Sequence, residues 1–152
     1  MNLHAWVLLG DMSSRKGSTV RALTGISRDR LDPIEVTLTN GQSIQIHPKV
    51  ASINEKNVPT PESWLARWSR SAVRQNLILA FRLRFGPKGR RPDDYVKALV
   101  EAGGTIESIV TLGETTPDWA IQIGAPYAHI LDAATTPTNA NAHRVRQFWG
   151  WL

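Results

Sequence analysis

The sequence predicts an α+β fold, in which β-hairpins and an antiparallel sheet pack against two main α-helices and a short C-terminal helix completes a single domain, residues 1–152. Three observations lead to this class. With 152 residues, 41% of them hydrophobic and 20% charged, the chain is long and apolar enough for one core. An alternating stretch with a central Asn-Gly pair is typical of a hairpin. Two later stretches carry helix-start signals followed by apolar residues at helical spacing.

The hairpin lies at residues 34–46, IEVTLTNGQSIQI. A two-residue Asn-Gly loop would place the apolar residues of the two strands on opposite faces of the hairpin. A three-residue loop, 39–41, pairs Val36 with Ile44, keeps the apolar residues on one face and puts Gly41 at the left-handed position that the bulge requires. We therefore predict the three-residue loop.

Two helices are predicted from their first residues. Thr60 and Pro61 give one helix a capping hydroxyl and a proline at its first position. Pro92 opens the second helix, which Gly103 ends. After the first helix, residues 79–85 alternate apolar and basic, which favours a strand with its arginines outward; continuation of the helix is the alternative. The other predicted elements are strands at 3–9, 106–112 and 119–123 and a C-terminal helix at 140–149.

Residues 13–18, SSRKGS, are typical of an exposed loop because of their Ser and Gly content. A nucleotide-binding P-loop needs Gly, four residues and then Gly-Lys-Ser/Thr. Here Lys16 precedes Gly17, so its amine would not be placed to reach a β-phosphate. We therefore do not expect a P-loop at this position.

The chain is basic, with a net charge of +5, and its basic residues cluster. Residues 13–21 contain three basic residues and no acid, and residues 67–91 contain eight Lys or Arg and no acid. Such a surface favours an acidic partner, either a nucleic acid or an acidic protein face; a solvated face is the alternative. The residues expected to make a nonspecific DNA contact or to meet an acidic partner are Arg82, Arg84, Lys88, Arg90 and Arg91.

Catalytic chemistry has little support in the sequence. The chain has no cysteine, and its four histidines lack a metal-ligand spacing. His129 and Asp132 are close enough in sequence for an orienting pair, but no matching nucleophile accompanies them. We therefore expect a protein that is not an enzyme, with no catalytic residues, no metal and no cofactor. The apolar run 4–9 is too short for a signal sequence or a membrane span, so we expect a soluble protein without membrane contact.

The C-terminus is rich in aromatic residues. The chain has six tryptophans, and two of them, Trp149 and Trp151, lie in its last four positions. Chain ends fray unless they are docked, so these rings are expected to be buried, either against this domain or against a partner. Residues 136–152 are predicted to form an interaction arm that follows a turn at residues 124–135. The predicted subunit interface comprises Tyr127, His129, Asp132, Thr135, Phe148, Trp149 and Trp151.

A family pattern runs through the same region. Its parts are Ile106 to Ile109, a turn, Ala120 to Gly124, Pro126-Tyr127-Ala128, Ile130, Asp132 and Ala134-Thr135. This pattern resembles the C-terminal half of the tail-completion or neck proteins of tailed bacteriophages, with Ala134 where that family has glycine. The terminal Arg146-Gln147-Phe148-Trp149 segment likewise lacks the family's proline.

The resemblance implies a virion structural protein that is not an enzyme and forms an oligomeric ring at the head–tail connection or along the bacteriophage tail. Its implied partners are further copies of this chain and other virion proteins, with virus assembly in the cytoplasm of the host bacterium. A basic nucleic-acid-binding protein that uses residues 82–91 is the alternative function.

Overall fold

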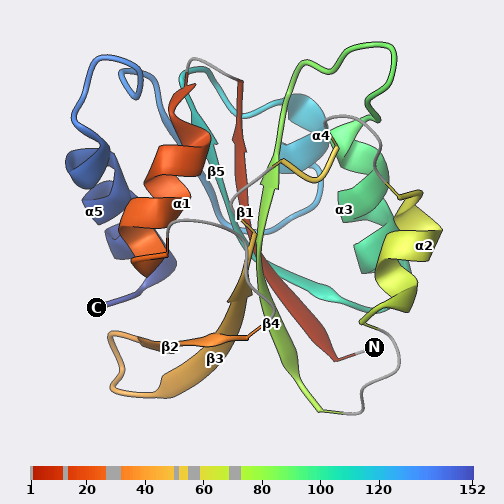
Figure 1. The fold of residues 1–152 in the computed structure, drawn as a ribbon, viewed down its shortest axis with the longest axis horizontal. Coiled ribbons are helices and arrows are strands. Elements are labelled where there is room, and N and C mark those ends of the chain that lie inside the picture. Colours follow the sequence, from red (N-terminus) through yellow and green to blue (C-terminus); the bar gives the residue numbers. More distant parts are fainter. Residues whose placement is uncertain (1, 12–13, 27–31, 50–51, 55–58, 69–72) are drawn as a thin grey trace.

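A six-stranded sheet with helices on both faces forms the described part of the chain (Figure 1). The computed structural model describes residues 2–11, 14–26, 32–49, 52–54, 59–68 and 73–152. The strands are β1 (Leu3–Gly10), β2 (Ile34–Thr37), β3 (Ser43–Pro48), β4 (Gln75–Phe81), β5 (Thr105–Leu112) and β6 (Tyr127–Ile130). The helices are α1 (Lys16–Thr24), α2 (Pro61–Ala66), α3 (Pro92–Glu101), α4 (Asp118–Ile121) and α5 (Thr138–Trp149). The strand order is β2-β3-β4-β1-β5-β6.

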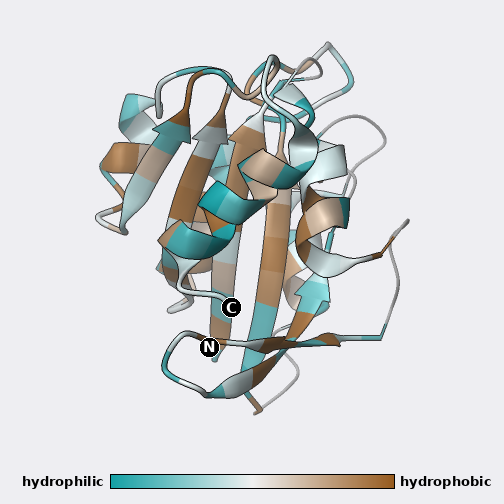
Figure 2. Ribbon diagram, turned by 90° about the vertical axis from the view of Figure 1, so that its left-hand side faces the viewer, coloured by the Kyte–Doolittle hydropathy of each residue, from teal (hydrophilic) through white to brown (hydrophobic). Residues whose placement is uncertain are grey.

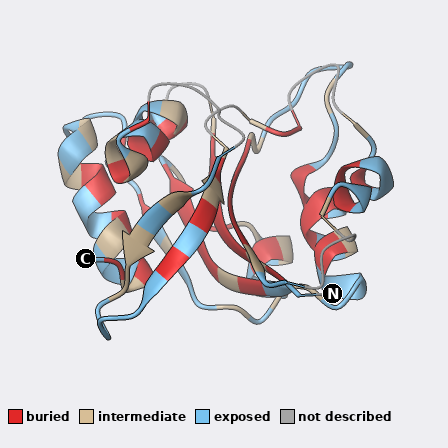
Figure 3. Cartoon of the chain, turned by 60° about the horizontal axis from the view of Figure 1, so that its bottom comes forward, coloured by how far each residue is buried: buried red, intermediate tan, exposed pale blue. Residues whose placement is uncertain are grey.

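Strand β1 runs through the middle of the sheet and is covered on both faces. Its side chains alternate, so that Trp6 and Leu8 pack with α1 and α5, whereas Val7 and Leu9 pack with α2, α3 and α4. Parallel strands β4 and β5 flank it on its two edges. Apolar residues therefore run along the central strands in Figure 2, and Figure 3 shows the same strands buried. The two hydrophobic cores lie on opposite faces of this strand.

The mixed helix and strand content is confirmed, but the sheet is mostly parallel. Among the strands of the described residues, β2 and β3 are the one antiparallel pair. The prediction of an antiparallel sheet is in that respect wrong. The cause lies in the segment expected to be an exposed loop, because Lys16 is the first residue of α1. Val20 and Leu23 of α1 are buried in the core that contains Trp6 and Leu8 of β1. A helix of this kind supplies the crossover that parallel strands require.

Two predicted strands are corrected. Residues 119–123 lie in the short helix α4 and the turn after it, because Pro117 and Asp118 open a helix there. The strand predicted at 79–85 is β4, which ends at Phe81, before Arg82. Burial on both faces explains this limit, since an arginine on β4 would be placed inside a core.

The hairpin register is confirmed. Val36 pairs with Ile44 and Ile34 pairs with Ile46, while Gly41 has a φ of 87°. The start of α2 is also confirmed, as the Thr60 hydroxyl accepts a hydrogen bond from the backbone N–H of residue 63. The strands predicted at 3–9 and 106–112, the helix that begins at Pro92 and the C-terminal helix are present as well.

The aromatic C-terminus packs on this chain's own core. Trp149 and Trp151 are 6% and 4% exposed, and the Trp151 ring lies 5.8 Å from that of Trp6 in an edge-on arrangement. The backbone N–H of Leu152 donates to the carbonyl of Thr37 at 2.9 Å, which fastens the end of the chain to the hairpin. The interface predicted for the two tryptophans is corrected accordingly, because their surface is already covered without a partner.

The packing of the C-terminus on the core leads to a prediction about the free energy of unfolding. Trp151→Ala should lower the free energy of unfolding by about 3–5 kcal/mol, because it removes a large ring from a packed core. Leu152→Ala is the control, since that side chain is 72% exposed and its loss should cost about 0.5 kcal/mol or less. Urea unfolding followed by circular dichroism measures both variants. Equal stability of the two would show that the ring does not hold the C-terminus.

Candidate functional site

The carboxyl ends of the parallel strands meet at one edge of the sheet, at the top in Figure 1. Helix α1, which follows β1, lies on one face, whereas α3 and α4, which follow β4 and β5, lie on the other. The connections after neighbouring strands therefore leave in opposite directions at the end of β1. Open α/β sheets bind ligands in the crevice that such a switch creates.

The connection from β1 to α1 is compact in its described residues, which are 10, 11 and 14–16. The Ser14 backbone N–H and hydroxyl both donate to the carbonyl of Asp11, at 3.0 and 2.5 Å. Gly10 permits this close approach, because an added Cβ would lie 2.4 Å from the Ser14 hydroxyl oxygen and 3.3 Å from the carbonyl oxygen of Leu112. The carboxyl end of β5 therefore lies close to the start of this loop, at Gly10.

The loop ends on Arg15 and Lys16. Arg15 has φ 59° and ψ 33°, and it is the one non-glycine residue with positive φ in the described part of the chain. Lys16 is the first residue of α1 and is only 6% exposed. In these described segments, α1 has no acid in its first turn and no side-chain cap. A helix start of this kind presents N–H groups and a positive dipole end, which suit an anion.

Arg84 joins this loop to its neighbours. Its backbone N–H donates to Asp11 Oδ1 at 2.9 Å, and its guanidinium pairs with Asp11 Oδ2. The same guanidinium nitrogen lies 3.1 Å from Glu114 Oε2. Asp11 follows β1, Arg84 follows β4 and Glu114 follows β5. One arginine thus links the ends of three neighbouring strands.

Asn54 holds the basic segment 82–91 in place. Its side chain is fully buried, its amide donates to the carbonyls of Arg82 and Arg90 at 2.8 and 2.9 Å, and its oxygen accepts from the Arg82 backbone N–H at 2.8 Å. A single amide therefore closes this segment beside the carboxyl edge. Sequence patterns gave no signal for this role of Asn54.

The predicted basic residues lie at the same edge of the sheet, but they are not alike. Arg84 and Arg91 already pair with carboxylates, Arg91 with Asp93 at 2.8 Å. Lys88 and Arg90 are exposed, and Arg82 is half-buried. The structure thus brings the basic cluster together, with part of its charge neutralised.

The predicted interface residues separate into two groups. Tyr127 and His129 lie exposed on the edge strand β6, and Phe148 is 40% exposed on α5. Asp132 accepts from Arg144 at 2.7 Å, which lowers the pKa of Asp132, and Thr135 donates to its carbonyl at 3.1 Å. Trp149 and Trp151 lie inside, as described above.

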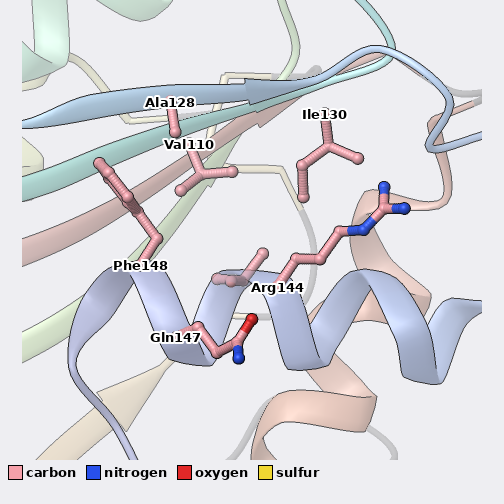
Figure 4. A pocket seen from close by; sticks show the side chains of 7 residues that line it. Val110, Ala128, Ile130, Arg144, Gln147 and Phe148 are labelled. Carbon is pink, nitrogen blue, oxygen red and sulfur yellow. The ribbon is translucent and has the colours of Figure 1, made fainter.

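An apolar hollow of about 400 Å³ lies between α5 and the strands β5 and β6 (Figure 4). Val110, Ala128 and Ile130 form its floor, and Phe148 and Arg144 flank it from α5. The hollow opens beside the exposed side chains of β6. It is an apolar surface and lacks the convergent polar groups of a catalytic pocket.

This geometry decides neither of two predictions, that the chain is not an enzyme and that it makes no membrane contact. Asp132 pairs with Arg144, and no hydrogen bond joins it to His129 among the described residues. Within those residues, no three His, Asp or Glu side chains gather as a metal site. The helices of the described segments also include none that is long and apolar enough to cross a bilayer.

Comparison with family models, with curated proteins and with solved structures found no match. The resemblance to tail-completion or neck proteins is therefore untested, and the expectations that follow from it stay predictions. Function has to be inferred from the residues themselves.

The sequence did contain a signal for the start of α1. The template of Gly, four residues and Gly-Lys-Ser/Thr does not fit if Gly17 is taken as its second glycine, because Gly17 follows Lys16. Counting from Gly10 instead gives Gly10, four residues, Arg15 and Lys16. Arg15 then stands for the second glycine, and it adopts a left-handed conformation that usually favours glycine. Gly17 stands where the template has Ser or Thr.

The buried Asp93 predicts a pH dependence. Burial alone would raise the pKa of Asp93, but hydrogen bonds from Arg91 and Lys97 outweigh it and lower the pKa below 3.8. The stabilisation by the ionised group is thus complete above about pH 4, the unfolded pKa, and is lost as the pH falls through the lower folded pKa. Asp93→Asn should cost about 2 kcal/mol at pH 7, and its difference from the native chain should shrink below about pH 4.

Unfolding free energies measured between pH 2 and 7 check this dependence. Asp94→Asn is the matched control. Asp94 is exposed in the same first turn, and its substitution removes the same interaction of a carboxylate with the helix dipole. A pH-independent difference between Asp93→Asn and the native chain would contradict the ion-pair account.

Proposed function

We propose that this chain binds the phosphate groups of a nucleotide at the carboxyl edge of its sheet, in the crevice where α1 begins. The observation that carries the proposal is Lys16, a buried lysine at the first position of a helix that follows the central strand, six residues after Gly10. In a P-loop, a lysine at this position reaches the phosphates that the loop's N–H groups surround.

The local topology supports the proposal. A phosphate loop connects a strand to a helix in a parallel sheet, and β1 and α1 have this relation. The crevice lies at the switch between crossover directions, where α/β sheets bind ligands. The Gly10 backbone leaves room for the loop to fold tightly, as the contacts of Ser14 with Asp11 indicate.

Electrostatics support a phosphate ligand. Arg15 and Lys16 stand at the positive end of α1, and the basic segment 82–91 lies beside them through the contact of Arg84 with Asp11. Phosphate oxygens accept several charge-assisted hydrogen bonds, which guanidinium, ammonium and backbone N–H groups all donate. A nucleotide therefore fits this edge better than an apolar ligand.

The proposal is limited to binding. P-loops that hydrolyse nucleotides hold Mg²⁺ with the Ser or Thr after the lysine, and Gly17 has no side chain for this role. Asp11 and Glu114, two acids at this edge of the sheet, are engaged with Arg84. Phosphate binding is compatible with the prediction that the chain is not an enzyme.

Replacing Lys16 tests the proposal. Lys16→Met keeps a long, buried side chain but removes its charge, so affinity for ATP and for tripolyphosphate should fall about tenfold or more, because a charge-assisted hydrogen bond is lost. Titration calorimetry at low ionic strength measures both ligands. Lys97→Met is the control, since Lys97 lies on α3 and pairs with Asp93 at 3.2 Å.

Two outcomes would refute phosphate binding at this loop. One is that the native chain binds neither ATP nor tripolyphosphate at millimolar concentration. The other is that Lys16→Met and Lys97→Met weaken binding equally while both stay folded. Binding of duplex DNA that depends on residues 82–91 and not on Lys16 would favour the nucleic-acid alternative instead.

A second candidate function is that of a virion subunit that assembles with copies of itself. The observation that favours it is the apolar hollow of Figure 4 beside the exposed Tyr127 and Phe148. Exposed apolar surface next to an edge strand is typical of a contact between proteins. Arg144, which lines the hollow, forms an ion pair with Asp132 at 2.7 Å, and such a charged pair suits the polar rim of a protein interface.

Phe148→Glu tests assembly. If this surface joins copies, the native chain should sediment as an oligomer and Phe148→Glu as a monomer, because the charge would be buried at the contact. Val100→Glu is a matched control, since Val100 is 39% exposed on α3, on the opposite face of the sheet. Native chain that sediments as a monomer at every concentration would contradict this candidate.

A further inference from the structure

Arg84 is a cation at the carboxyl edge that a ligand can reach from solvent. Its side chain is 75% exposed, although it pairs with Asp11 and Glu114. Lys16, in contrast, is 6% exposed at the start of α1. The site thus has one buried basic residue and another that is exposed at its rim.

We propose that Arg84 makes this site select ligands with two or more linked phosphates over a single phosphate, and that Glu114 competes with the ligand for the guanidinium of Arg84. This inference rests on the proposed function. A single phosphate at the start of α1 is bound by Lys16 and the helix N–H groups. A second phosphate in the chain extends outward and meets Arg84 at the rim.

The guanidinium of Arg84 suits this role because of its shape. It offers several N–H donors in a planar fork, which binds phosphate oxygens in pairs. Its position is fixed from below, since the Arg84 backbone N–H also donates to Asp11. The segment that carries Arg84 is itself held by the buried amide of Asn54. Little ordering of the backbone is then required when the ligand arrives.

Of the two carboxylates, Glu114 is the one that the ligand displaces from Arg84. The Asp11 carboxylate takes two contacts from Arg84, one from the backbone and one from the side chain, and is 19% exposed. Glu114 takes one contact, at 3.1 Å, and its side chain is 36% exposed. The weaker and more solvated ion pair breaks at lower cost. Release of Glu114 also moves a negative charge away from the incoming phosphates.

The test compares tripolyphosphate with inorganic phosphate by titration calorimetry. Arg84→Ala should weaken tripolyphosphate binding about tenfold while changing phosphate binding less than about twofold. Arg84→Lys keeps the charge but loses the planar fork, so its affinity for tripolyphosphate should lie between those of the native chain and Arg84→Ala. Glu114→Gln should strengthen tripolyphosphate binding about threefold, because the competing charge is gone.

The control is Arg74→Ala. Arg74 pairs with Glu107 at 3.5 Å next to the first residue of β4, at the opposite edge of the sheet, so this change removes the same charge far from the site. Circular dichroism confirms that each variant is folded. Arg84→Lys and Glu114→Gln keep the inference testable if Arg84→Ala does not fold.

The outcomes separate this inference from the proposed function. If Lys16→Met abolishes binding of both probes while the Arg84 variants leave the ratio of the two affinities unchanged, selection by Arg84 is wrong and phosphate binding stands. Weaker tripolyphosphate binding by Glu114→Gln would also overturn it. If the native chain binds neither probe, the proposed function itself fails.

Discussion

Strand β1 imposes the constraint on which the rest of the structure depends. It is covered on both faces and hydrogen-bonded on both edges by parallel neighbours. The buried residues of such a strand, 5–9 in β1, are apolar, and the first carboxylate after the strand is that of Asp11, at the carboxyl end of the sheet. Since β4 and β5 run in the same direction, Arg84 and Glu114 follow their strands at the same edge. The ion pairs of Arg84 are therefore a consequence of parallel pairing.

At the carboxyl edge of the sheet, the positions of the acidic and basic side chains matter more than their numbers. Asp11 and Glu114 both contact Arg84, and the first turn of α1, which begins at Lys16, contains no acidic residue. The positive end of the helix dipole adds to the same region. The proposed anion site lies where the loop meets α1, whereas Asp11 follows β1 and Glu114 follows β5.

Local features of the fold could be predicted from the sequence. The hairpin register follows from the positions of Val36, Ile44 and Gly41, and the helix starts follow from Thr60 and Pro92, because each signal lies within a few residues of its effect. The period of residues 119–123 was too short to separate a strand from a helix.

Features that depend on distant contacts could not be predicted in the same way. Helix α1 contains glycine, serine and threonine, which favour loops, and it forms because Val20 and Leu23 bury against β1. The sequence also could not tell whether Trp149 and Trp151 would dock on Trp6 or on a partner. The motif of the proposed site is hard to find in the sequence, because its first glycine, Gly10, lies on the strand. Its second glycine is replaced by Arg15, which nevertheless takes a left-handed backbone conformation.

The two candidate surfaces share one rigid element. Helix α5 is fastened to α1 at both ends, because Arg146 donates to the carbonyl of Ala22 at 2.8 Å and Arg15 donates to the carbonyl of Thr136, just before α5, at 3.3 Å. Phe148 and the hollow of Figure 4 belong to α5, while the proposed phosphate site lies at the start of α1. A phosphate that draws Arg15 away from Thr136 acts on the segment that leads into α5. Under the two proposals, these contacts would link ligand binding to assembly, and evidence for one proposal does not count against the other.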